Sequence, residues 1–388
     1  MHARELLHNV LKESSSIGNK ARQRSLINAV DSVVIGGGKL SLSSIGRNRA
    51  GNIKVKHKIK ETDYLLGNAH LRKERISIYA GLSKEILRGL KEVTIIVDWS
   101  PAISKDNQIL KASCAMPGRS LTLYEEIYPE ELLGNYEVHK KFLRRLKAII
   151  EPSGCKVTVI TDAGFRTEWF NLVREIGWGF IGRIRSNMFF RHKESTIWES
   201  CRSEYKKATS KIKYYGEILL TKANELPCYM YLNKESNKKV NANKKKMSTT
   251  DKEYRRGAEE PWLLVSSELM ESKKIIKTYK KRMQIEHEFR DTKDVQWGIG
   301  LSTTRSKDIG RLEILLLIGA LAIFLLWKIG LITEAEKKHY DYQANTVRNK
   351  RILSLVYLGL QVIKHAPDSI TTEKINNIFQ QWRNKNAQ

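Results

Sequence analysis

Apolar and polar positions alternate differently in successive parts of the chain, and the pattern changes most clearly near residue 92. The β-branched run VTIIVDWS (93–100) predicts a buried strand, and NQILKASCAM (107–116) and RSLTLYEEIY (119–128) flank a Pro-Gly turn, which predicts a hairpin. Residues 136–150 place apolar side chains on one side of a helix. A strand, a hairpin and a helix in this order predict an α/β fold with mixed strand directions.

A second strand–helix–strand pattern follows. KVTVITDAG (156–164) and GFIGRIR (179–185) predict strands on either side of a short helix at 168–176. Residues 187 to about 260 are polar and rich in Tyr and Lys, which predicts a β-rich insertion. Within it, two strand-like pieces (215–221 and 228–233) precede a Lys- and Asn-rich run (233–257) for which we predict disorder.

A regular pattern of apolar positions returns after the insertion. PWLLVSSE (261–268) predicts a strand, and a long helix is expected to begin near Ser272. Residues 312–326 are almost entirely apolar but include Glu313 and fall short of the roughly 20 residues that cross a bilayer. We therefore expect a buried helix there and no association with a membrane.

The two ends of the chain are expected to be helical. Residues 1–88 are basic and are interrupted by IGGGKLSLSSIGR (35–47). They suit either small helices that contact DNA, in the manner of a helix-turn-helix, or a basic helical cap over the core. The predicted organisation is a helical N-terminal DNA-binding region (1–88), a catalytic core (89–330) that carries the insertion, and a helical C-terminal region (331–388).

Charge points to a polyanionic partner. Lys and Arg number 69 against 42 acidic residues, a formal net charge of +27. Binding to nucleic acid is favoured at such a charge, because each neutralised phosphate releases counterions. The four cysteines are far apart in sequence, which excludes a zinc knuckle and favours a reducing compartment. The N-terminus lacks the apolar stretch of a signal peptide, so we expect a cytoplasmic protein.

Two aspartates end predicted strands. Asp98 ends VTIIVD and Asp162 ends VTVITD. Carboxylates at strand ends of an open α/β sheet commonly line the ligand-binding crevice, and a divalent cation is a natural partner for convergent carboxylates. Either aspartate alone is equally explained as a helix cap or a turn residue.

A third acid lies on a helix with an unusual face. In YKKRMQIEHEFRDTK, one stripe roughly 80° wide carries a phenol, a carboxylate and three cations, at about 100° per residue. Ordinary ion pairs on a solvated face would explain the charges but not the phenol or the two upstream aspartates. The stripe consists of Tyr279, Arg282, Glu286, Arg290 and Lys293.

A nuclease site accounts for the two aspartates, for the carboxylate and cations of the helix face, and for the phenol beside them. Asp98, Asp162 and Glu286 could hold two metal ions about 4 Å apart, as in phosphodiester displacement. The neighbouring cations would grip the phosphates beside the scissile bond, and Tyr279 would hydrogen-bond or stack near the terminal nucleotides.

The motifs resemble those of a known family. The pattern Y-x2-R-x3-E-x6-K, met by Tyr279, Arg282, Glu286 and Lys293, is similar to the signature of the insertion-sequence family 4 DDE transposases. IVDWS, TDAGF and the long insertion before the Glu helix also match that family. GRSLTLYE, KRMQIEHEFRDTK and QANTVRN resemble the branch typified by the transposon ten transposase. The resemblance covers roughly residues 93–365.

The resemblance implies an RNase H-like core and cut-and-paste DNA transposition with Mg²⁺, for which Mn²⁺ can substitute. It implies a synaptic homodimer on inverted terminal repeats, hairpinned transposon ends, and joining of the 3′-OH to target DNA in a bacterial, nucleoid-associated setting. Asp98, Asp162 and Glu286 would be the catalytic metal ligands. The DNA-binding positions implied by the family are Tyr279, Arg282, Arg290 and Lys293.

A hairpin needs a tightly bent strand, which a flipped base stacked on an aromatic ring would ease. Trp262 is the candidate ring, although a tryptophan packed in a core strand explains it equally; Trp99 and Trp297 are weaker candidates. Two other functions stay open: a DNA-junction or repair nuclease on the same core, and a DNA-binding protein without catalytic activity. The intact acids argue against the second.

Overall fold

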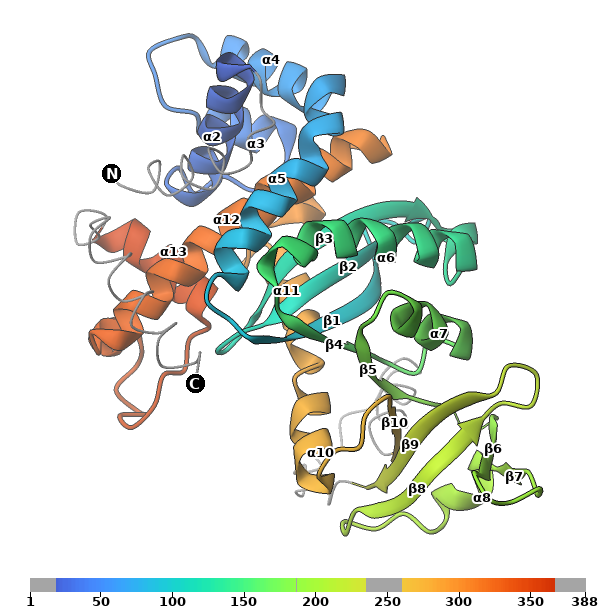
Figure 1. Cartoon of the computed structure of the whole chain (residues 1–388). Helices are drawn as coiled ribbons and strands as arrows, with labels where there is room; N and C mark the ends of the chain where they lie inside the picture. The colour runs from blue at the N-terminus through green and yellow to red at the C-terminus, as the bar shows by residue number, and fades with distance from the viewer. Residues whose placement is uncertain (1–18, 186, 235–259, 367–388) are drawn as a thin grey trace, which may run out of the picture. The chain divides into compact units, whose positions relative to one another are not determined.

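The computed structural model describes residues 19–185, 187–234 and 260–366, which divide between two compact units (Figure 1). Unit 1 draws on Met1–Leu133, Arg144–Lys156 and Met283–Gln388, and unit 2 on Gly134–Leu143 and Val157–Arg282. All but the first two residues of the run predicted to be disordered lie outside the described residues. The three domains predicted from the sequence stay a prediction; the two units divide the predicted core between them.

Helices begin unit 1 within the described residues, as predicted. They are α2 (Lys20–Val34), α3 (Leu42–Arg47), α4 (Val55–Leu66) and α5 (Ala69–Leu87). The side chains of Asn19 and Asn68 cap α2 and α5 by accepting hydrogen bonds from backbone N–H groups of the first turn. Gly46 allows α3 to approach α4, because a Cβ at this position would lie 2.6 Å from the Cα of Ile59.

An antiparallel meander follows in unit 1. Its strands are β1 (Glu92–Pro101), β2 (Asn107–Ala115) and β3 (Ser120–Pro129), in the spatial order β3-β2-β1. The predicted hairpin is confirmed. Its turn contains Gly118, whose φ of +71° lies in the region that favours glycine.

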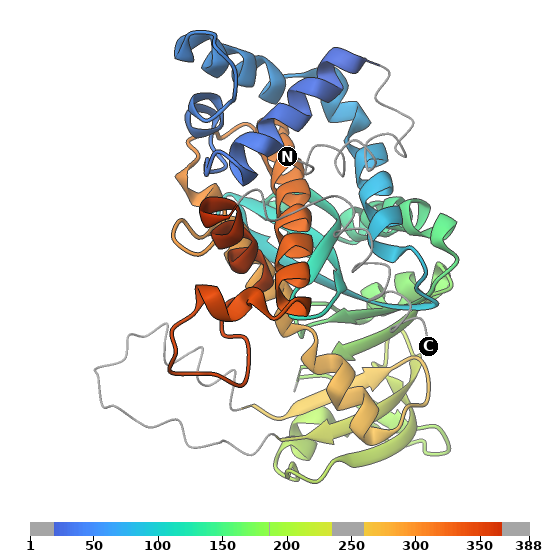
Figure 2. The same ribbon diagram turned by 90° about the vertical axis from the view of Figure 1, so that its left-hand side faces the viewer.

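The predicted apolar helix is buried in unit 1. It is α12 (Ile309–Ala335), whose 27 residues are enough by length and composition to cross a membrane, yet its most apolar window is 100% buried in the protein. The predicted burial is confirmed, and the predicted length was too short because the helix continues past both ends of the apolar run. α13 (Leu355–His365) packs against it, and a Cβ on Gly330 would lie only 2.0 Å from the Leu355 carbonyl oxygen (Figure 2, orange and red).

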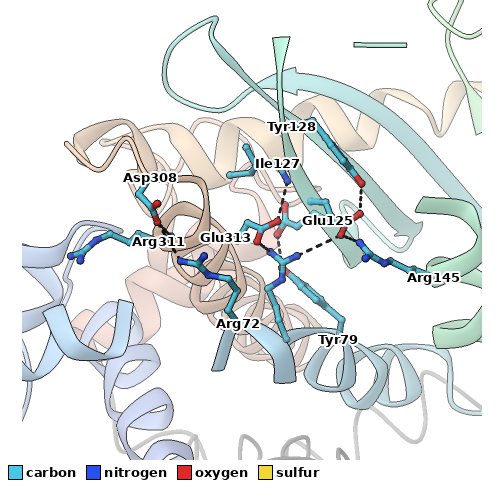
Figure 3. Close-up of polar contacts among 11 residues, drawn as sticks. Arg72, Tyr79, Glu125, Ile127, Tyr128, Arg145, Asp308, Arg311 and Glu313 are labelled. Carbon is cyan, nitrogen blue, oxygen red and sulfur yellow. Dashed lines mark hydrogen bonds and ion pairs between the residues drawn. The ribbon is translucent and has the colours of Figure 1, made fainter. Parts of the chain in front are cut away.

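Glu313, the acid within this apolar run, has partners elsewhere in unit 1. Its Oε2 lies 2.6 Å from a guanidinium nitrogen of Arg75 on α5, and its Oε1 accepts a hydrogen bond from the Ile127 N–H of β3 at 3.4 Å (Figure 3). A buried carboxylate is tolerated when it is paired in this way. The ion pair therefore explains how an acid fits into a buried helix.

Unit 2 contains a mixed sheet in the order β4-β5-β10-β9-β8-β6-β7. β4 and β5 are parallel and are joined through α7, whereas the neighbouring strands from β5 to β7 in this order pair antiparallel. The predicted strands of this region are confirmed. Its elements are β4 (Lys156–Thr161), α7 (Thr167–Glu175), β5 (Gly179–Arg183), β6 (Phe189–His192), β7 (Glu199–Ser200), α8 (Cys201–Tyr205), β8 (Lys213–Leu220), β9 (Leu226–Asn233), β10 (Trp262–Ser266) and α10 (Ser272–Lys280).

The remaining elements complete the mixed α/β fold that the sequence predicted. A meander, a helix and a strand–helix–strand segment follow one another in the order of an RNase H-like core, with β6 to β9 as the β-rich insertion. The other helices are α6 (Tyr136–Ile150), which begins in unit 2 and ends in unit 1, α11 (Met283–Lys293), and the 3-10 turns η1 (Glu130–Leu132), η2 (Glu151–Ser153), η3 (Leu301–Thr303) and η4 (Lys338–Tyr342).

The single long helix predicted from Ser272 onward is wrong. α10 ends at Lys280 and α11 begins at Met283. The N–H groups of Lys281 and Arg282 bond to carbonyls three residues back, which tightens the chain and interrupts the α-helix. The stripe expected on one uninterrupted helix is therefore divided between two helices and between the two units.

Candidate active site

Asp98 lies on β1, three residues before that strand ends. Its predicted place at the strand end is wrong, because the strand goes on pairing with β2 as far as Pro101. Asp98 is half-buried, and its Oδ1 accepts a hydrogen bond from the Trp99 N–H at 2.9 Å. Lys111 of β2 stands directly opposite Asp98 in the antiparallel ladder, so the two side chains share one face of the sheet.

Asp162 follows directly on β4, as predicted. It is half-buried, and its Oδ1 accepts a hydrogen bond from the Gly164 N–H at 2.8 Å. A Cβ on Gly164 would lie 2.9 Å from that oxygen, so a larger residue there would displace the carboxylate from its present position. Asp162 belongs to unit 2, whereas Asp98 and Glu286 belong to unit 1. The meeting of all three acids stays a prediction.

Asp98 and Glu286 line one seam of unit 1, between β1 and α11. The two elements are in contact, and the Nζ of Lys293 donates a hydrogen bond to the Ser100 Oγ at 2.7 Å. Ser100 is two residues from Asp98 and therefore on the same face of the strand. Lys293 is seven residues from Glu286, two helical turns along the same side of α11.

Lys293 is half-buried in this seam. Burial lowers the pKa of Lys293 to about 8, and repulsion from Lys111 adds to the effect, while Glu125 and Asp98 oppose it. The Nζ also lies 5.0 Å from the centre of the Phe289 ring. The ammonium is thus held among charged groups next to Asp98 rather than on an open surface.

The other members of the predicted stripe differ in their surroundings. Tyr279 is 3% exposed in a hydrophobic cluster of unit 2, so its ring offers no open face for stacking. Arg282 is half-buried in unit 2, and Arg290 is exposed on α11. Trp262 packs edge-on against Tyr279 with the ring centres 5.1 Å apart and is only partly buried. It is the first residue of β10 and lies beside the carboxyl end of β5, at the same end of these strands as Asp162.

The two weaker tryptophan candidates lie in unit 1. The Trp99 ring is edge-on to Tyr128, with the ring centres 5.8 Å apart. Trp297 is 48% exposed and rests against Tyr357, with the ring centres 5.0 Å apart. Each ring therefore already has an aromatic neighbour.

A buried polar network behind α11 was not predicted. The Lys111 Nζ lies 3.1 Å from Glu125 and 3.7 Å from Glu288, and each of these side chains is 1% exposed. Ser120 donates a hydrogen bond to Glu288 at 2.5 Å, and Thr122 donates another. Burial lowers the pKa of Lys111, but the two carboxylates outweigh it and leave that pKa raised.

One signal in the sequence could have revealed this network. QILKASCAM places a lysine within an apolar strand, and LTLYEEIY places two glutamates in the next one. Charged side chains in strands that are otherwise buried must find partners. The partner contributed by α11, Glu288, was visible only as one more charge in a polar helix.

The three acids suit a hard divalent cation. All three are carboxylates and all are half-buried, which leaves them between full burial and free solvation. Mg²⁺ prefers such oxygen ligands and usually retains several waters. Among the described residues, no group of three or more His, Cys, Asp and Glu side chains gathers closely enough to hold a metal ion, and Asp162 belongs to a different unit from the other two acids.

Comparison with known proteins identifies the class. The family model described as "Transposase DDE domain" matches residues 132–325, which is half of the 388-residue chain. The chain therefore belongs to the DDE transposase domain family: it is an enzyme that cleaves and transfers DNA. This match identifies the family, and only the sequence motifs bear on the branch within it.

No curated protein matches the chain. Among solved structures, the piggyBac transposase synaptic complex with hairpin DNA is similar, with a TM-score of 0.39 and 10% identity over 97% of this chain and 82% of that one.

Proposed function

We propose that this transposase is a cut-and-paste enzyme that binds inverted terminal repeats, cleaves the transposon ends and joins their 3′-OH groups to target DNA. The observation that carries the proposal is the β1–α11 seam, where Asp98 and Glu286 lie on facing elements beside Lys293. The motifs of the insertion-sequence family 4 branch support the same activity.

Asp98, Asp162 and Glu286 are the proposed ligands of two Mg²⁺ ions. Bound there, the ions would activate the attacking oxygen and stabilise the departing 3′-oxygen of the phosphodiester. The chain's own contribution is to fix the carboxylates. Asp98 is held by the Trp99 N–H and Asp162 by the Gly164 N–H, so both enter the reaction already oriented.

The basic side chains would bind the DNA backbone. The net charge of +27 favours a polyanion, and Arg282, Arg290 and Lys293 flank the proposed metal ligand on α11. Lys293 is the best placed of them, because it is tied to the strand that carries Asp98. Tyr279 would act through its hydroxyl group, since its ring is buried.

Hairpin formation at the transposon ends belongs to the same proposal. Trp262 is partly exposed at the sheet edge of unit 2 that also carries Asp162, which suits a ring that receives a flipped base. We also propose a synaptic homodimer, since two DNA ends must be cut together. The resemblance to the insertion-sequence family supports the further proposal of a bacterial, nucleoid-associated location.

A cleavage assay tests the proposal. Labelled DNA carrying the ends of the element is incubated with Mg²⁺ and wild-type protein or with Asp98→Ala, Asp162→Ala or Glu286→Ala. We expect hairpinned ends with wild type. Each variant should bind the DNA but lose cleavage by more than a hundredfold, the scale on which one charge-stabilising group contributes to catalysis. Wild-type protein that binds the ends and never cuts them would instead identify a passive DNA-binding protein.

A repair or junction nuclease predicts a different outcome. Such an enzyme would cut branched DNA in preference to the ends of the element and would leave no hairpin. The same gel with a four-way junction as a second substrate therefore distinguishes the two activities.

A further inference from the structure

A row of charged residues crosses the meander of unit 1. Asp98 on β1 is the ladder partner of Lys111 on β2, and Lys111 is in turn the partner of Glu125 on β3. Directly opposed residues of antiparallel strands project from the same face, with Cβ atoms about 5 Å apart. The proposed metal ligand Asp98 thus stands at one end of a three-strand row whose centre is a buried lysine.

The helix that carries Glu286 contacts the same lysine. Glu288 on α11 lies 3.7 Å from the Lys111 Nζ and accepts hydrogen bonds from Ser120 and Thr122 of β3. A register shift at Ala112/Ser113 sets this arrangement, because it places Thr122 opposite Ser113 while Glu125 stays opposite Lys111. β3 can therefore present hydroxyl groups and a carboxylate toward one cluster.

The buried contacts of Glu288 and Asp291 also set the rotation of α11 about its own axis. Glu288 is two residues, about 200°, around the helix from Glu286. Asp291, less than one turn further along, lies 2.6 Å from the Nε of Arg119. These two buried anchors hold one side of the helix on the β2–β3 hairpin, and the hydrogen bond from Lys293 to Ser100 fixes the side that carries Glu286.

Lys111 joins the sheet to the helix within this arrangement. It pairs with Glu125 of the sheet and with Glu288 of the helix, and its side chain is 1% exposed. Removing a lysine from such a cluster leaves two buried carboxylates without their cation, which strongly favours rearrangement. The rearrangement would move α11 relative to β1.

We propose that Lys111 is a positioning residue of the transposase site, which holds the Glu286 helix in register with the Asp98 strand through Glu125 and Glu288. The role rests on the proposed function, since it concerns the geometry of two proposed metal ligands. It is not expected to contact DNA, because the lysine is buried.

The test replaces Lys111 by methionine, which is of similar length and uncharged, and Glu288 by glutamine as a milder variant. Binding of Mn²⁺ alone to the full-length protein is followed by electron paramagnetic resonance, and backbone hydrogen exchange is followed over residues 283–293. We expect Lys111→Met to weaken Mn²⁺ binding about ten- to a hundredfold, the scale seen when residues that orient metal ligands are lost. Exchange in α11 should accelerate at least tenfold, and Glu288→Gln should produce a smaller change of the same sign.

Lys328→Met is the matched control. Lys328 is also buried in unit 1, 3% exposed, and it lies 3.8 Å from Glu85 and 4.7 Å from the Phe324 ring centre. This variant should lower thermal stability while leaving Mn²⁺ affinity and exchange in α11 within about twofold of wild type, because its partners Glu85 and Phe324 lie on α5 and α12 rather than on α11 or β1.

Two outcomes would overturn the positioning role. One is wild-type exchange in α11 in both Lys111→Met and Glu288→Gln, and the other is an equal loss of Mn²⁺ binding in Lys328→Met. If wild-type protein itself binds no Mn²⁺, the two-metal function fails instead, and hydrogen exchange still decides whether Lys111 anchors the helix.

Discussion

The Nζ of Lys293 donates a hydrogen bond to the Ser100 Oγ at 2.7 Å, and this contact joins the last turn of α11 to β1. Since Ser100 shares a strand face with Asp98, the lysine connects the elements that carry two of the proposed metal ligands.

Lys293→Ala should slow cleavage of the transposon ends, but less than loss of any of the three acids. The defect should be largest at low ionic strength and shrink as salt rises, because a variant with one phosphate contact fewer releases fewer counterions and therefore depends less on salt. Cleavage rates measured at several salt concentrations test this, with Lys328→Met as a control lysine away from the seam. Equal rates of Lys293→Ala and wild type at all salt concentrations would make the stripe merely structural.

His139 should make unit 2 sensitive to acid. The imidazole stacks on Phe165 with ring centres 5.4 Å apart and is edge-on to Trp169, and burial lowers the pKa of His139 to about 4. Relative to an unfolded pKa near 6.5, this contribution to stability is complete above about pH 6.5 and is lost as the pH falls through 4, by roughly 3 kcal/mol in all. Urea unfolding at pH 7, 5.5 and 4.5 should show a smaller loss in His139→Gln than in wild type, and equal losses would contradict the prediction.

Removing one partner of the Arg75–Glu313 pair should lower the free energy of unfolding more than removing both. Arg75→Met leaves the Glu313 carboxylate in a buried helix with only a long hydrogen bond from Ile127, and should cost about 3–5 kcal/mol in the free energy of unfolding. The double variant Arg75→Met/Glu313→Leu should recover much of that loss, because the Glu313 carboxylate is then gone and Glu126, the other partner of Arg75, still pairs with Arg145. Denaturant melts of both variants decide this; a double variant less stable than the single one would show that the pair itself stabilises the fold.

Gly330→Ala should destabilise the protein although it lies in the middle of α12. Replacing a helical glycine by alanine ordinarily gains about 1 kcal/mol. Here the added Cβ would lie 2.0 Å from the Leu355 carbonyl oxygen, so α13 must move, at a cost of about 1–3 kcal/mol. The control is Gly67→Ala, whose Cβ would meet its nearest atom at an ordinary 3.5 Å. Thermal melts should show a lower Tm for the first variant alone, and a raised Tm would contradict the packing of α12 on α13.

Much of the fold could be read from local patterns. β-branched runs and the Pro-Gly turn predicted β1 to β3, and strand-like apolar runs predicted β4, β5, β8 and β9, whereas β6 and β7 were not predicted. These elements depend on local propensity and on burying one face, which leave a periodic trace in sequence. The break between α10 and α11 leaves no such trace, because Lys281 and Arg282 carry ordinary helix-forming side chains.

The candidate site shows the same division. Residue types and spacing indicated the acids and the basic stripe, since few side chains can bind metal ions or phosphates. Charged residues within apolar strands hinted at buried ion pairs, but the partners of Lys111 could not be assigned, because they come from β3 and α11 and become partners only when those elements pack.

By itself, the sequence determined the α/β class, the order of the elements, the burial of α12 and the kind of chemistry that three acids and a basic helix can perform. Tertiary structure decided that Lys293 reaches Ser100 and that the predicted stripe divides between two helices. It also decided that the Tyr279 side chain packs inside a hydrophobic cluster. The physical reason is that propensity and periodicity act between near neighbours in the chain. The partner of a buried charge or ring is chosen instead by packing between segments that the chain separates widely.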